Sequence, residues 1–339
     1  MTLARGARRR AFLARLGALA VLPAAGRAQQ PASARRVGII LTTSPLEEML
    51  GAEPRHPGVG AFLREMRSRG YAEGRNLLLL RRTAAGDFAR YPEIVAELAR
   101  LNVDVIVAAG NNALYASARA AAGSVPFVMI ASSEPDRAGL VVSLAKPGGN
   151  FTGLTIDVSP EIEVKRLELL KAVLPAARRV AYLATHAAWE VPYALAVRRA
   201  AAQFGVILEH VPHTPADYSG AFASIAARPP DALFASFSAE TFAHRREIAE
   251  FALAHRLPGI FPYQEMADSG GLLSFGMSVP DLFRRLAHYV DRILRGARPG
   301  DLPIERPTKF ELVVNLRSAR AIGVVVPQPI LLRADRVIE

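Results

Sequence analysis

The sequence predicts an α/β fold made of two doubly wound, parallel-sheet lobes. Three observations support this prediction. Beyond residue 36, short apolar runs alternate with amphipathic segments, which is typical of strands joined by crossover helices. A loop-rich stretch over residues 131–155, with a Lys-Pro-Gly-Gly-Asn turn signal, divides this alternation into two blocks. The chain has 339 residues, which is enough for two domains of ordinary size.

The first block predicts strands that are buried on both faces, because they are continuous β-branched or leucine runs. The first helix has Phe62, Leu63 and Met66 at helical spacing, and Gly70 stands where a C-cap would lie. The expected elements are a strand over 37–41, a helix over 58–69, a strand over 77–80, a helix over 91–101, a strand over 103–108, a helix over 113–122 and a strand over 126–130.

The second block repeats the same alternation. Its crossovers are short, so we expect them to be right-handed and to bury the sheet between two layers of helices. The expected elements are helices over 160–173, 191–204, 218–227, 239–255 and 280–294, and strands over 179–184, 206–211, 232–235, 259–261, 272–275 and 310–315, followed by a short helix and a Pro-rich tail.

Residues 1–28 have the pattern of an export signal. Arg5, Arg8, Arg9 and Arg10 form a basic start without an acid, an apolar run follows over 16–25, and residues 26–28, Gly-Arg-Ala, match a cleavage site. Residues 9–13, Arg-Arg-Ala-Phe-Leu, resemble a twin-arginine signal, although the Sec route stays open. The apolar run falls far short of the roughly 20 residues that span a membrane. We therefore expect cleavage near Ala28 and a soluble protein in the periplasm.

Charge and cysteine content exclude several classes of function. Six arginines and no acidic residue lie before residue 29, so the formal charge of +11 falls to +5 after cleavage. The remaining charge is spread along the chain, which argues against nucleic acid as a partner. The chain has no cysteine, so disulfides, thiolate metal sites, cysteine nucleophiles and a lipid-modified cysteine are excluded. We expect no cofactor and no metal.

Polar and aromatic residues follow the predicted strands at the carboxyl ends, where open α/β sheets bind ligands. Hydroxyl, amide and aromatic groups of this kind suit a small polar or amphipathic molecule. Ser, Thr and Asn also cap helices, so capping explains any single position equally well. The set as a whole favours a ligand cleft between the lobes. The candidates are Thr42, Thr43, Ser44, Asn111, Asn112, Ser132 and Ser133 in the first lobe, and Thr185, His186, Trp189, Ser236, Tyr263 and Glu265 in the second.

Within this set, Asn111 and Asn112 open a predicted helix whose free N–H groups could hold a carboxylate. Glu265 is the acid best placed to meet an ammonium group, so an amino acid is a candidate ligand. Trp189 could stack on an apolar part of the ligand or could simply be a half-buried surface aromatic. Glu47 and Glu48, after the first strand, are most simply expected in a solvated acidic loop, and a place on the rim of the cleft is the alternative.

Motifs for catalysis are missing. There is no Gly-x-Ser-x-Gly elbow, and neither Gly-x-Gly-x-x-Gly nor a Walker loop follows the first strand. His210 and His213 are separated by a proline-containing turn and have no obvious third ligand for a metal. We therefore expect a protein that is not an enzyme.

Several segments resemble the ABC transporter substrate-binding family related to the tryptophan- and tyrosine-binding lipoproteins. The most specific is 144–154, Leu-Ala-Lys-Pro-Gly-Gly-Asn-Phe-Thr-Gly-Leu, and the likeness runs from about residue 37 to residue 339. Weaker matches are Val-Gly-Ile-Ile at 37–40, Phe-Leu-Arg-Glu-Met at 62–66, Glu-Leu-Leu-Lys at 168–171 and Lys-Phe-Glu-Leu-Val-Val-Asn at 309–315.

The resemblance implies a type I periplasmic binding protein fold with a three-segment hinge near 151–155, 274–277 and 305–310. It places residues 37–153 with 277–304 in lobe 1 and residues 154–276 with 305–339 in lobe 2. It also implies that Asn111, Asn112, Ser132 and Ser133 hold the carboxylate of an amino acid, with Glu265 as the acid from lobe 2.

The leading hypothesis is a monomeric solute-binding protein that closes on a small-molecule ligand and presents it to an ABC transporter permease. A ligand-sensing partner of a membrane receptor is the first alternative, and the sequence does not separate it from import. An exported α/β enzyme that uses His186 or Glu265 would need a nucleophile–base pair that is not visible. A sugar-responsive regulator of the same fold would need a DNA-binding head where this chain has the export signal.

Overall fold

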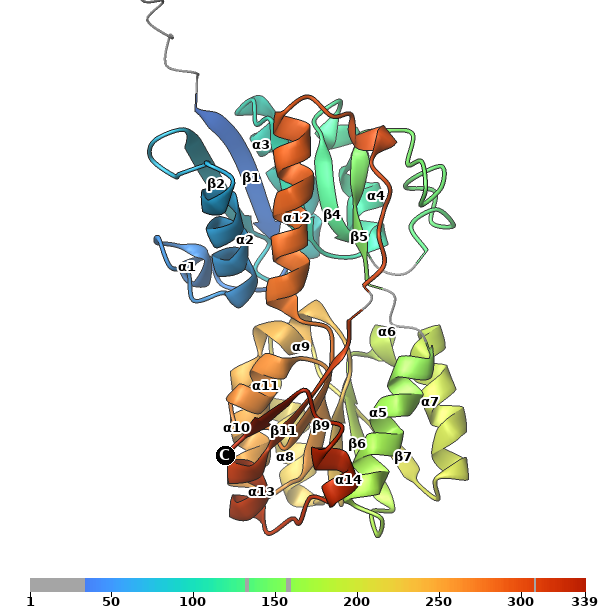
Figure 1. Ribbon diagram of the computed structural model, residues 1–339. Coiled ribbons are helices and arrows are strands. Elements are labelled where there is room, and N and C mark those ends of the chain that lie inside the picture. The colour runs from blue at the N-terminus through green and yellow to red at the C-terminus, as the bar shows by residue number, and fades with distance from the viewer. Residues whose placement is uncertain (1–33, 132–133, 157–159, 308) are drawn as a thin grey trace, which may run out of the picture. The chain divides into compact units, whose positions relative to one another are not determined.

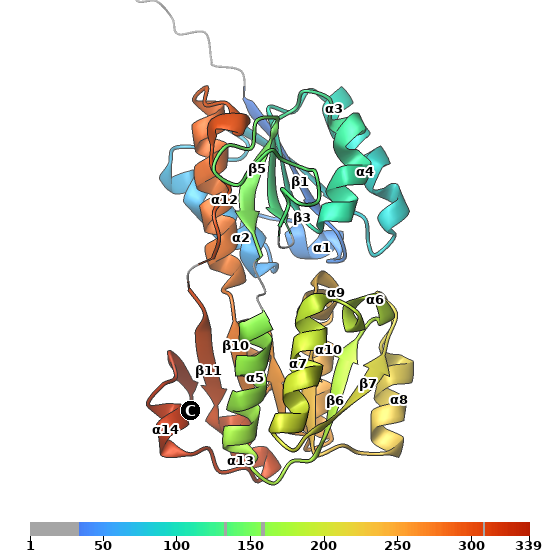
Figure 2. The same cartoon turned by 90° about the vertical axis from the view of Figure 1, so that its right-hand side faces the viewer.

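The computed structural model describes residues 34–131, 134–156, 160–307 and 309–339. The export signal and the cleavage site near Ala28, as well as Ser132 and Ser133, lie outside the described residues. Two β-sheets form the frame of the described chain, and each sheet has helices on both faces (Figures 1 and 2). The prediction of an α/β fold with two lobes is confirmed.

The first sheet is parallel throughout and has the strand order β2-β1-β3-β4-β5. Figure 2 shows α2 and α12 on one face of it and α3 and α4 on the other. Its strands are β1 (Arg35–Leu41), β2 (Leu77–Thr83), β3 (Val105–Ala109), β4 (Phe127–Ala131) and β5 (Phe151–Thr155), and its helices are α1 (Leu46–Met49), α2 (Pro57–Ser68), α3 (Tyr91–Arg100), α4 (Asn112–Ala122) and α12 (Val279–Leu294), with 3-10 turns at Phe88–Arg90 and Pro299–Asp301.

The second sheet has the order β12-β11-β10-β9-β8-β6-β7. In Figure 1, α5 and α7 cover one face, and α8, α10 and α11 cover the other. Its strands are β6 (Arg179–Ala184), β7 (Ile207–Pro212), β8 (Ala232–Ala235), β9 (Gly259–Phe261), β10 (Leu273–Gly276), β11 (Glu311–Asn315) and β12 (Arg336–Ile338), and its helices are α5 (Pro160–Val173), α6 (His186–Trp189), α7 (Pro192–Gln203), α8 (Ser219–Ala227), α9 (Ala239–Ala243), α10 (Arg245–Ala254), α11 (Gln264–Asp268), α13 (Leu316–Ile322) and α14 (Gln328–Leu331).

One strand departs from the predicted parallel pattern: β11 runs antiparallel to β10. After β10 the chain forms α12 against the first sheet and then returns, so it enters the second sheet at the end where β10 leaves it. Since β11 starts at the carboxyl end of its neighbour, it must run in the opposite direction. Strand β12 then pairs parallel to β11, within a segment that the sequence suggested was only a Pro-rich tail.

The predicted loop over 131–155 ends in a strand, β5, which pairs parallel to β4. Gly153 makes this pairing possible, because a Cβ atom there would lie 2.1 Å from the carbonyl oxygen of Met129 and the residue has φ +133°. The Thr-Gly pair inside β5 interrupts the apolar run, so the sequence looked like a loop.

The predicted helix over 239–255 is two helices, α9 and α10, which meet at His244. The guanidinium group of Arg245 donates to the carbonyl oxygen of Phe242 at 3.1 Å, close to this break. Among the described residues, four further short helices were not predicted: α1 in the supposed acidic loop, α6 directly after Thr185, α11 directly after Tyr263 and α14 in the supposed Pro-rich tail.

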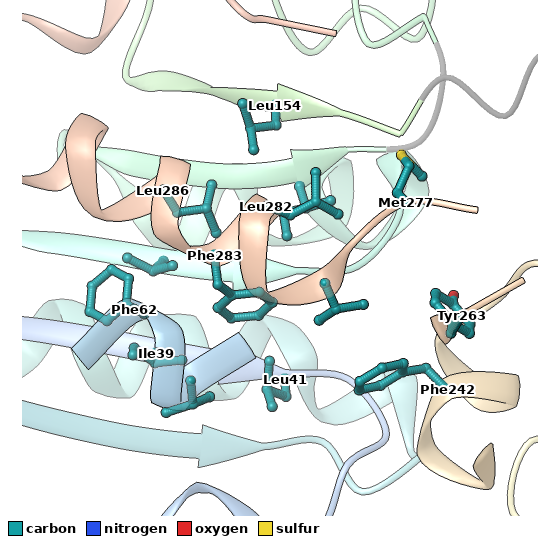
Figure 3. Close-up of a cluster of buried hydrophobic side chains, with 14 of the residues drawn as sticks. Ile39, Leu41, Phe62, Leu154, Phe242, Tyr263, Met277, Leu282, Phe283 and Leu286 are labelled. Carbon is teal, nitrogen blue, oxygen red and sulfur yellow. The ribbon is translucent and has the colours of Figure 1, made fainter. Parts of the chain in front are cut away.

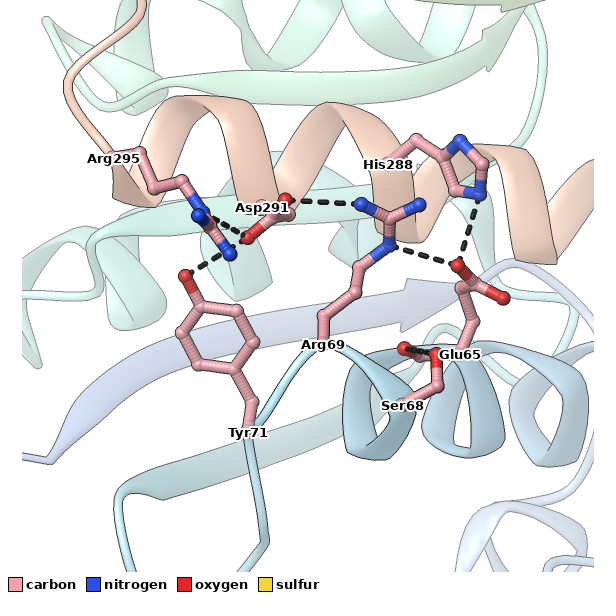
Figure 4. Close-up of polar contacts among 7 residues, drawn as sticks. All are labelled: Glu65, Ser68, Arg69, Tyr71, His288, Asp291 and Arg295. Atoms are coloured by element: carbon pink, nitrogen blue, oxygen red, sulfur yellow. Dashed lines mark hydrogen bonds and ion pairs between the residues drawn. The ribbon is translucent and has the colours of Figure 1, made fainter.

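Helix α12 is fixed to α2 by apolar packing and by a polar network around Asp291 (Figure 4). The carboxylate of Asp291 accepts hydrogen bonds from Arg69 at 3.0 Å, Tyr71 at 3.1 Å and Arg295 at 2.7 Å. Glu65 in turn accepts from Arg69 at 2.8 Å and lies 3.0 Å from His288. These contacts tie a helix from late in the chain to the first sheet.

The apolar core is continuous between the two sheets on one side (Figure 3). It runs from Ile39 in β1 and Phe62 in α2, through Phe283 in α12, to Phe242 in α9 and Tyr263 after β9. Since the core of each lobe continues into the other, we expect the two lobes to stabilise each other.

Candidate functional site

In each sheet there is a pair of neighbouring strands whose following helices lie on opposite faces of the sheet and lead the chain toward opposite edges. In the first sheet this switch point lies between β1 and β3, because the chain passes from β1 to α2 on one face and from β3 to α4 on the other. In the second sheet it lies between β6 and β8, which are followed by α7 and α10 on opposite faces. Open α/β sheets bind ligands beyond the carboxyl ends of the strands at such points.

The predicted residues of the first lobe border its switch point. Thr42 and Ser44, after β1, are buried, and Thr43 donates from its hydroxyl group to the carbonyl oxygen of Ala239 at 3.0 Å. Asn111, after β3, is exposed, and its side chain accepts from the backbone N–H of Leu114 at 3.0 Å. Asn112 begins α4 and is half-buried. Asn111 therefore caps α4, and both asparagines are at the correct edge of the sheet.

Of the residues after β6, Thr185 caps α6 by accepting from the N–H of Ala188 at 3.1 Å, and His186 is exposed. The ring of Trp189 stacks parallel to that of His210, with centroids 4.6 Å apart, and Arg198 lies 4.2 Å from its centroid. These contacts within its own lobe account for the position of Trp189 without a ligand, so its role in binding stays a prediction.

The loops after β8 and β9 bring an aromatic group to this edge of the second sheet. The hydroxyl group of Tyr263 donates to the carbonyl oxygen of Ser238 at 2.8 Å, and the rings of Phe237 and Tyr263 lie 4.8 Å apart. Tyr193, at the start of α7, places its hydroxyl group 3.5 Å from the carbonyl oxygen of Phe237. Ser236 is buried, with its hydroxyl group 3.5 Å from that of Thr241. Sequence reasoning missed Tyr193, because it is the second residue of a helix and does not directly follow a strand.

Glu48 does not extend into solvent as predicted. Its carboxylate accepts a hydrogen bond from the guanidinium group of Arg245 at 3.0 Å. The same guanidinium group lies 4.8 Å from the ring centroid of Phe242. The ring of His56 lies between Phe242 and Phe283, at 5.2 and 5.5 Å. Burial, with a further contribution from the charge of Arg245, lowers the pKa of His56 to about 3, so this histidine is neutral. The interpretation of Glu48 as part of a solvated loop is therefore wrong, since it joins α1 to α10.

Glu265 lies in the first turn of α11, and neither of its carboxyl oxygens has a hydrogen-bond partner among the described residues. Burial raises the pKa of this carboxyl group to about 7, while the nearby Arg245 lowers it and Asp268 raises it further. The group therefore keeps its proton to higher pH than an exposed glutamate does. An amine brought near it would favour the charged form.

A buried ion pair lies beneath the same edge, between Glu163 and Arg166 of α5. Sequence reasoning missed it, although a signal was present. Glu163 and Arg166 fall at helical spacing with Leu167 and Leu170 on the apolar face of their helix, where charged residues are rare.

No set of three or more His, Asp or Glu side chains that could hold a metal ion was found in the described part of the chain. A search of the same residues found no helix with the length and apolar character needed to cross a membrane.

Residues 54–338 match the family described as ABC transporter substrate binding protein. A tyrosine-binding protein of Clostridioides difficile is 24% identical over 265 residues, which cover 77% of this chain and 75% of the relative. Two solved structures share the fold. One, from Streptococcus pneumoniae in complex with L-Trp, has a TM-score of 0.73 and is 19% identical in sequence. The other, from Vibrio cholerae, has a TM-score of 0.74 and is 23% identical in sequence. Each match covers 90% of this chain and 100% of the other chain.

The fold and these matches define a substrate-binding protein and not an enzyme. The chain belongs to the ABC transporter substrate-binding protein family. The resemblance stated from the sequence is thereby confirmed.

Proposed function

We propose that this chain is the periplasmic solute-binding component of an ABC importer and that its ligand is an amino acid with an aromatic or apolar side chain. The observation that carries the ligand class is the aromatic group formed by Tyr193, Phe237 and Tyr263 beside the switch point of the second sheet. The names of two relatives, one a tyrosine-binding protein and one a complex with L-Trp, support the same class.

In this proposal the ligand lies between the two switch points. The start of α4, with Asn111 and Asn112, would accept the carboxylate, since helix N-termini bind anions. Glu265 would meet the ammonium group, and the aromatic group would contact the side chain. Ser132 and Ser133 stay part of the proposed carboxylate site, and Thr42, Thr43, Ser44, Thr185, His186 and Ser236 stay proposed neighbours of the ligand.

The lobe boundaries are part of the same proposal: residues 37–153 with 277–304 form lobe 1, and residues 154–276 with 305–339 form lobe 2. The placement of α12 against α2 supports the assignment of its segment to lobe 1. Export with cleavage near Ala28 and a monomeric state complete the proposal. Finding the protein in washed membranes but not in periplasmic extract would contradict the location.

A thermal-shift screen of the protein against the L-amino acids, with sugars, polyols and aromatic acids as other classes, tests the ligand class. A ligand at 100 times its Kd stabilises the folded state by about 2.7 kcal/mol, which raises the Tm by roughly 5 °C. We expect the largest rise for L-tyrosine, L-tryptophan or L-phenylalanine. Stabilisation by another class and by no amino acid would overturn the proposal.

Import is tested by measuring uptake of the best ligand in cells with and without this chain. We expect uptake to fall when the chain is deleted and to return when it is supplied again. Unchanged uptake, with loss of a transcriptional or motile response to the ligand, would favour a sensing role instead.

A further inference from the structure

The buried ion pair of α5 is the least solvated pair of charges in the described second lobe. Arg166 is 1% exposed and Glu163 is 0% exposed. One nitrogen of the guanidinium group, Nη1, donates to both carboxyl oxygens of Glu163, at 2.9 and 3.0 Å. Burial raises the pKa of Glu163 while Arg166 lowers it. Two charges without water are costly, and such a pair often contributes less stability than an apolar pair of the same size.

The other guanidinium nitrogen, Nη2, contacts the backbone of two strands. It donates to the carbonyl oxygen of Ala235 at 2.7 Å and to that of Ile260 at 3.1 Å. Ala235 is the last residue of β8, and Ile260 lies in β9. The guanidinium group also lies 4.3 Å from the ring centroid of Phe234.

These carbonyl groups lie where the two strands stop pairing. The ladder between β8 and β9 consists of Leu233 with Gly259 and Phe234 with Ile260. Directly beyond it the chain enters the loops that carry Ser236 and Tyr263. Arg166 therefore joins the two strands at the point where the loops of the proposed ligand site begin.

We propose that Arg166, oriented by Glu163, is a positioning residue of the ligand site: it fixes the ends of β8 and β9 and thereby the loops at 236–238 and 262–264. This inference rests on the proposed function, because it assumes that these loops contact the ligand. Arg166 itself need not touch the ligand, since its hydrogen bonds go to Glu163 and to the two strands.

An apolar replacement separates positioning from a merely structural role. The double variant Glu163→Leu/Arg166→Met removes both charges together, so it leaves no uncompensated charge in the core and is expected to fold. The matched control is Arg179→Met/Glu209→Leu, which removes a second Arg–Glu pair of the same lobe, 3.0 Å apart and further from the carboxyl edge, at the start of β6.

Amide hydrogen exchange of the ligand-free proteins is the first readout. In the Glu163→Leu/Arg166→Met variant we expect amide exchange at residues 236–238, 263 and 264 to accelerate about tenfold or more, with the urea midpoint near that of the wild type and unchanged exchange in β6 and β7. The control pair should leave the loops unchanged. Unchanged loop exchange in a folded variant, or equal acceleration across the whole lobe, would overturn the proposal.

Affinity for L-tyrosine and L-tryptophan, measured by calorimetry, is the second readout, and we expect it to fall about tenfold in the same variant. If the wild type binds neither amino acid, the proposed ligand class fails while the exchange result still decides the positioning role. If the double variant does not fold, Arg166→Lys replaces it. The Lys ammonium can still pair with Glu163 but has no fork that reaches two carbonyl groups, so the same local acceleration is expected.

Discussion

The carboxyl edges of the two sheets are organised differently. At the first, an uncharged side chain joins two strand ends: the hydroxyl group of Tyr115, in α4, donates to the carbonyl oxygen of Ile130 in β4 at 2.7 Å and lies 3.1 Å from that of Ala108 in β3, while Asn111 caps α4 at 3.0 Å. At the second, long side chains reach across elements: Arg166 contacts the ends of β8 and β9, and Tyr263 contacts Ser238. The first edge offers the backbone N–H groups at the start of α4, and the second has the half-buried rings of Tyr193 and Phe237. We expect the first edge to bind the part that all amino acids share and the second to discriminate among their side chains.

The largest expected effect tests whether the two lobes are independent. Phe127 is fully buried in the first lobe, and its ring stacks on that of Phe151 with centroids 4.7 Å apart. Phe127→Ala leaves a cavity there and should lower the free energy of unfolding by about 4 kcal/mol. Because the apolar core continues between the sheets, we expect one unfolding transition. The single tryptophan, Trp189, lies in the second lobe and reports on it alone. Its fluorescence midpoint in urea should fall together with the circular dichroism midpoint.

The matched variant Phe234→Ala makes the equivalent change in the second lobe, where Phe234 stacks on Tyr182 at 5.3 Å. If the Trp189 midpoint fell with Phe234→Ala but not with Phe127→Ala, the two lobes would unfold separately.

The next effect is a pH dependence that belongs to the second lobe. The pKa of Glu265 is about 7 in the folded protein, above its ordinary value of 4.5, so the folded state keeps this proton to higher pH than the unfolded state. The stability that this provides is complete below pH 4.5 and is lost as the pH rises to 7. The Glu265→Gln variant has no carboxyl group to titrate at this position. Between pH 4.5 and 7 the free energy of unfolding of the wild type should therefore fall by about 3 kcal/mol relative to that of the variant. Urea unfolding of both proteins at several pH values measures the difference, and parallel pH profiles would show that the carboxyl group is not buried.

Much of the fold could be predicted because its strands are buried on both faces. Continuous apolar runs such as 37–41 and 180–184 are typical of strands buried on both faces, and this local signal does not depend on contacts with the rest of the chain. The failures have a common cause in tertiary contacts. β5 depends on Gly153 coming close to Met129, and the direction of β11 depends on the chain returning from α12. Neither constraint is visible in a local window of sequence.

The candidate site could be predicted in part for the same reason. Residues directly after the strands, such as Thr42 and Asn111, were found because strand ends define the edge of a sheet. Tyr193 and Arg166 reach that edge from inside helices, so strand ends do not reveal them. For Arg166 the charged pair on an apolar helix face was the available signal.

A smaller effect concerns the ion pair that joins the two edges. Glu48→Gln removes the charged partner of the buried Arg245 and should lower the free energy of unfolding by only about 1 kcal/mol, because Glu48 is partly exposed and the amide oxygen of glutamine can still accept from the guanidinium group. Arg245 is then free to act on Glu265, so the pKa of Glu265 should fall. A lower midpoint of the pH dependence in Glu48→Gln measures this. Glu47→Gln, an exposed position on the same helix, is the control and should change neither quantity.

The smallest expected change in stability gives the sharpest test of the first edge. Asn111→Asp keeps an acceptor for the N–H of Leu114, so the free energy of unfolding should stay within about 0.5 kcal/mol of the wild type. The added charge would face the carboxylate that we place at the start of α4, and two like charges at about 4 Å repel by several kcal/mol in a partly buried site. Affinity for the amino-acid ligand, measured by calorimetry, should therefore fall roughly tenfold or more. Asn111→Ser keeps the cap without the charge and should bind the ligand more tightly than Asn111→Asp does. Equal affinity of Asn111→Asp and Asn111→Ser would mean that the carboxylate does not lie at the start of α4, and its assignment to the first edge would be wrong.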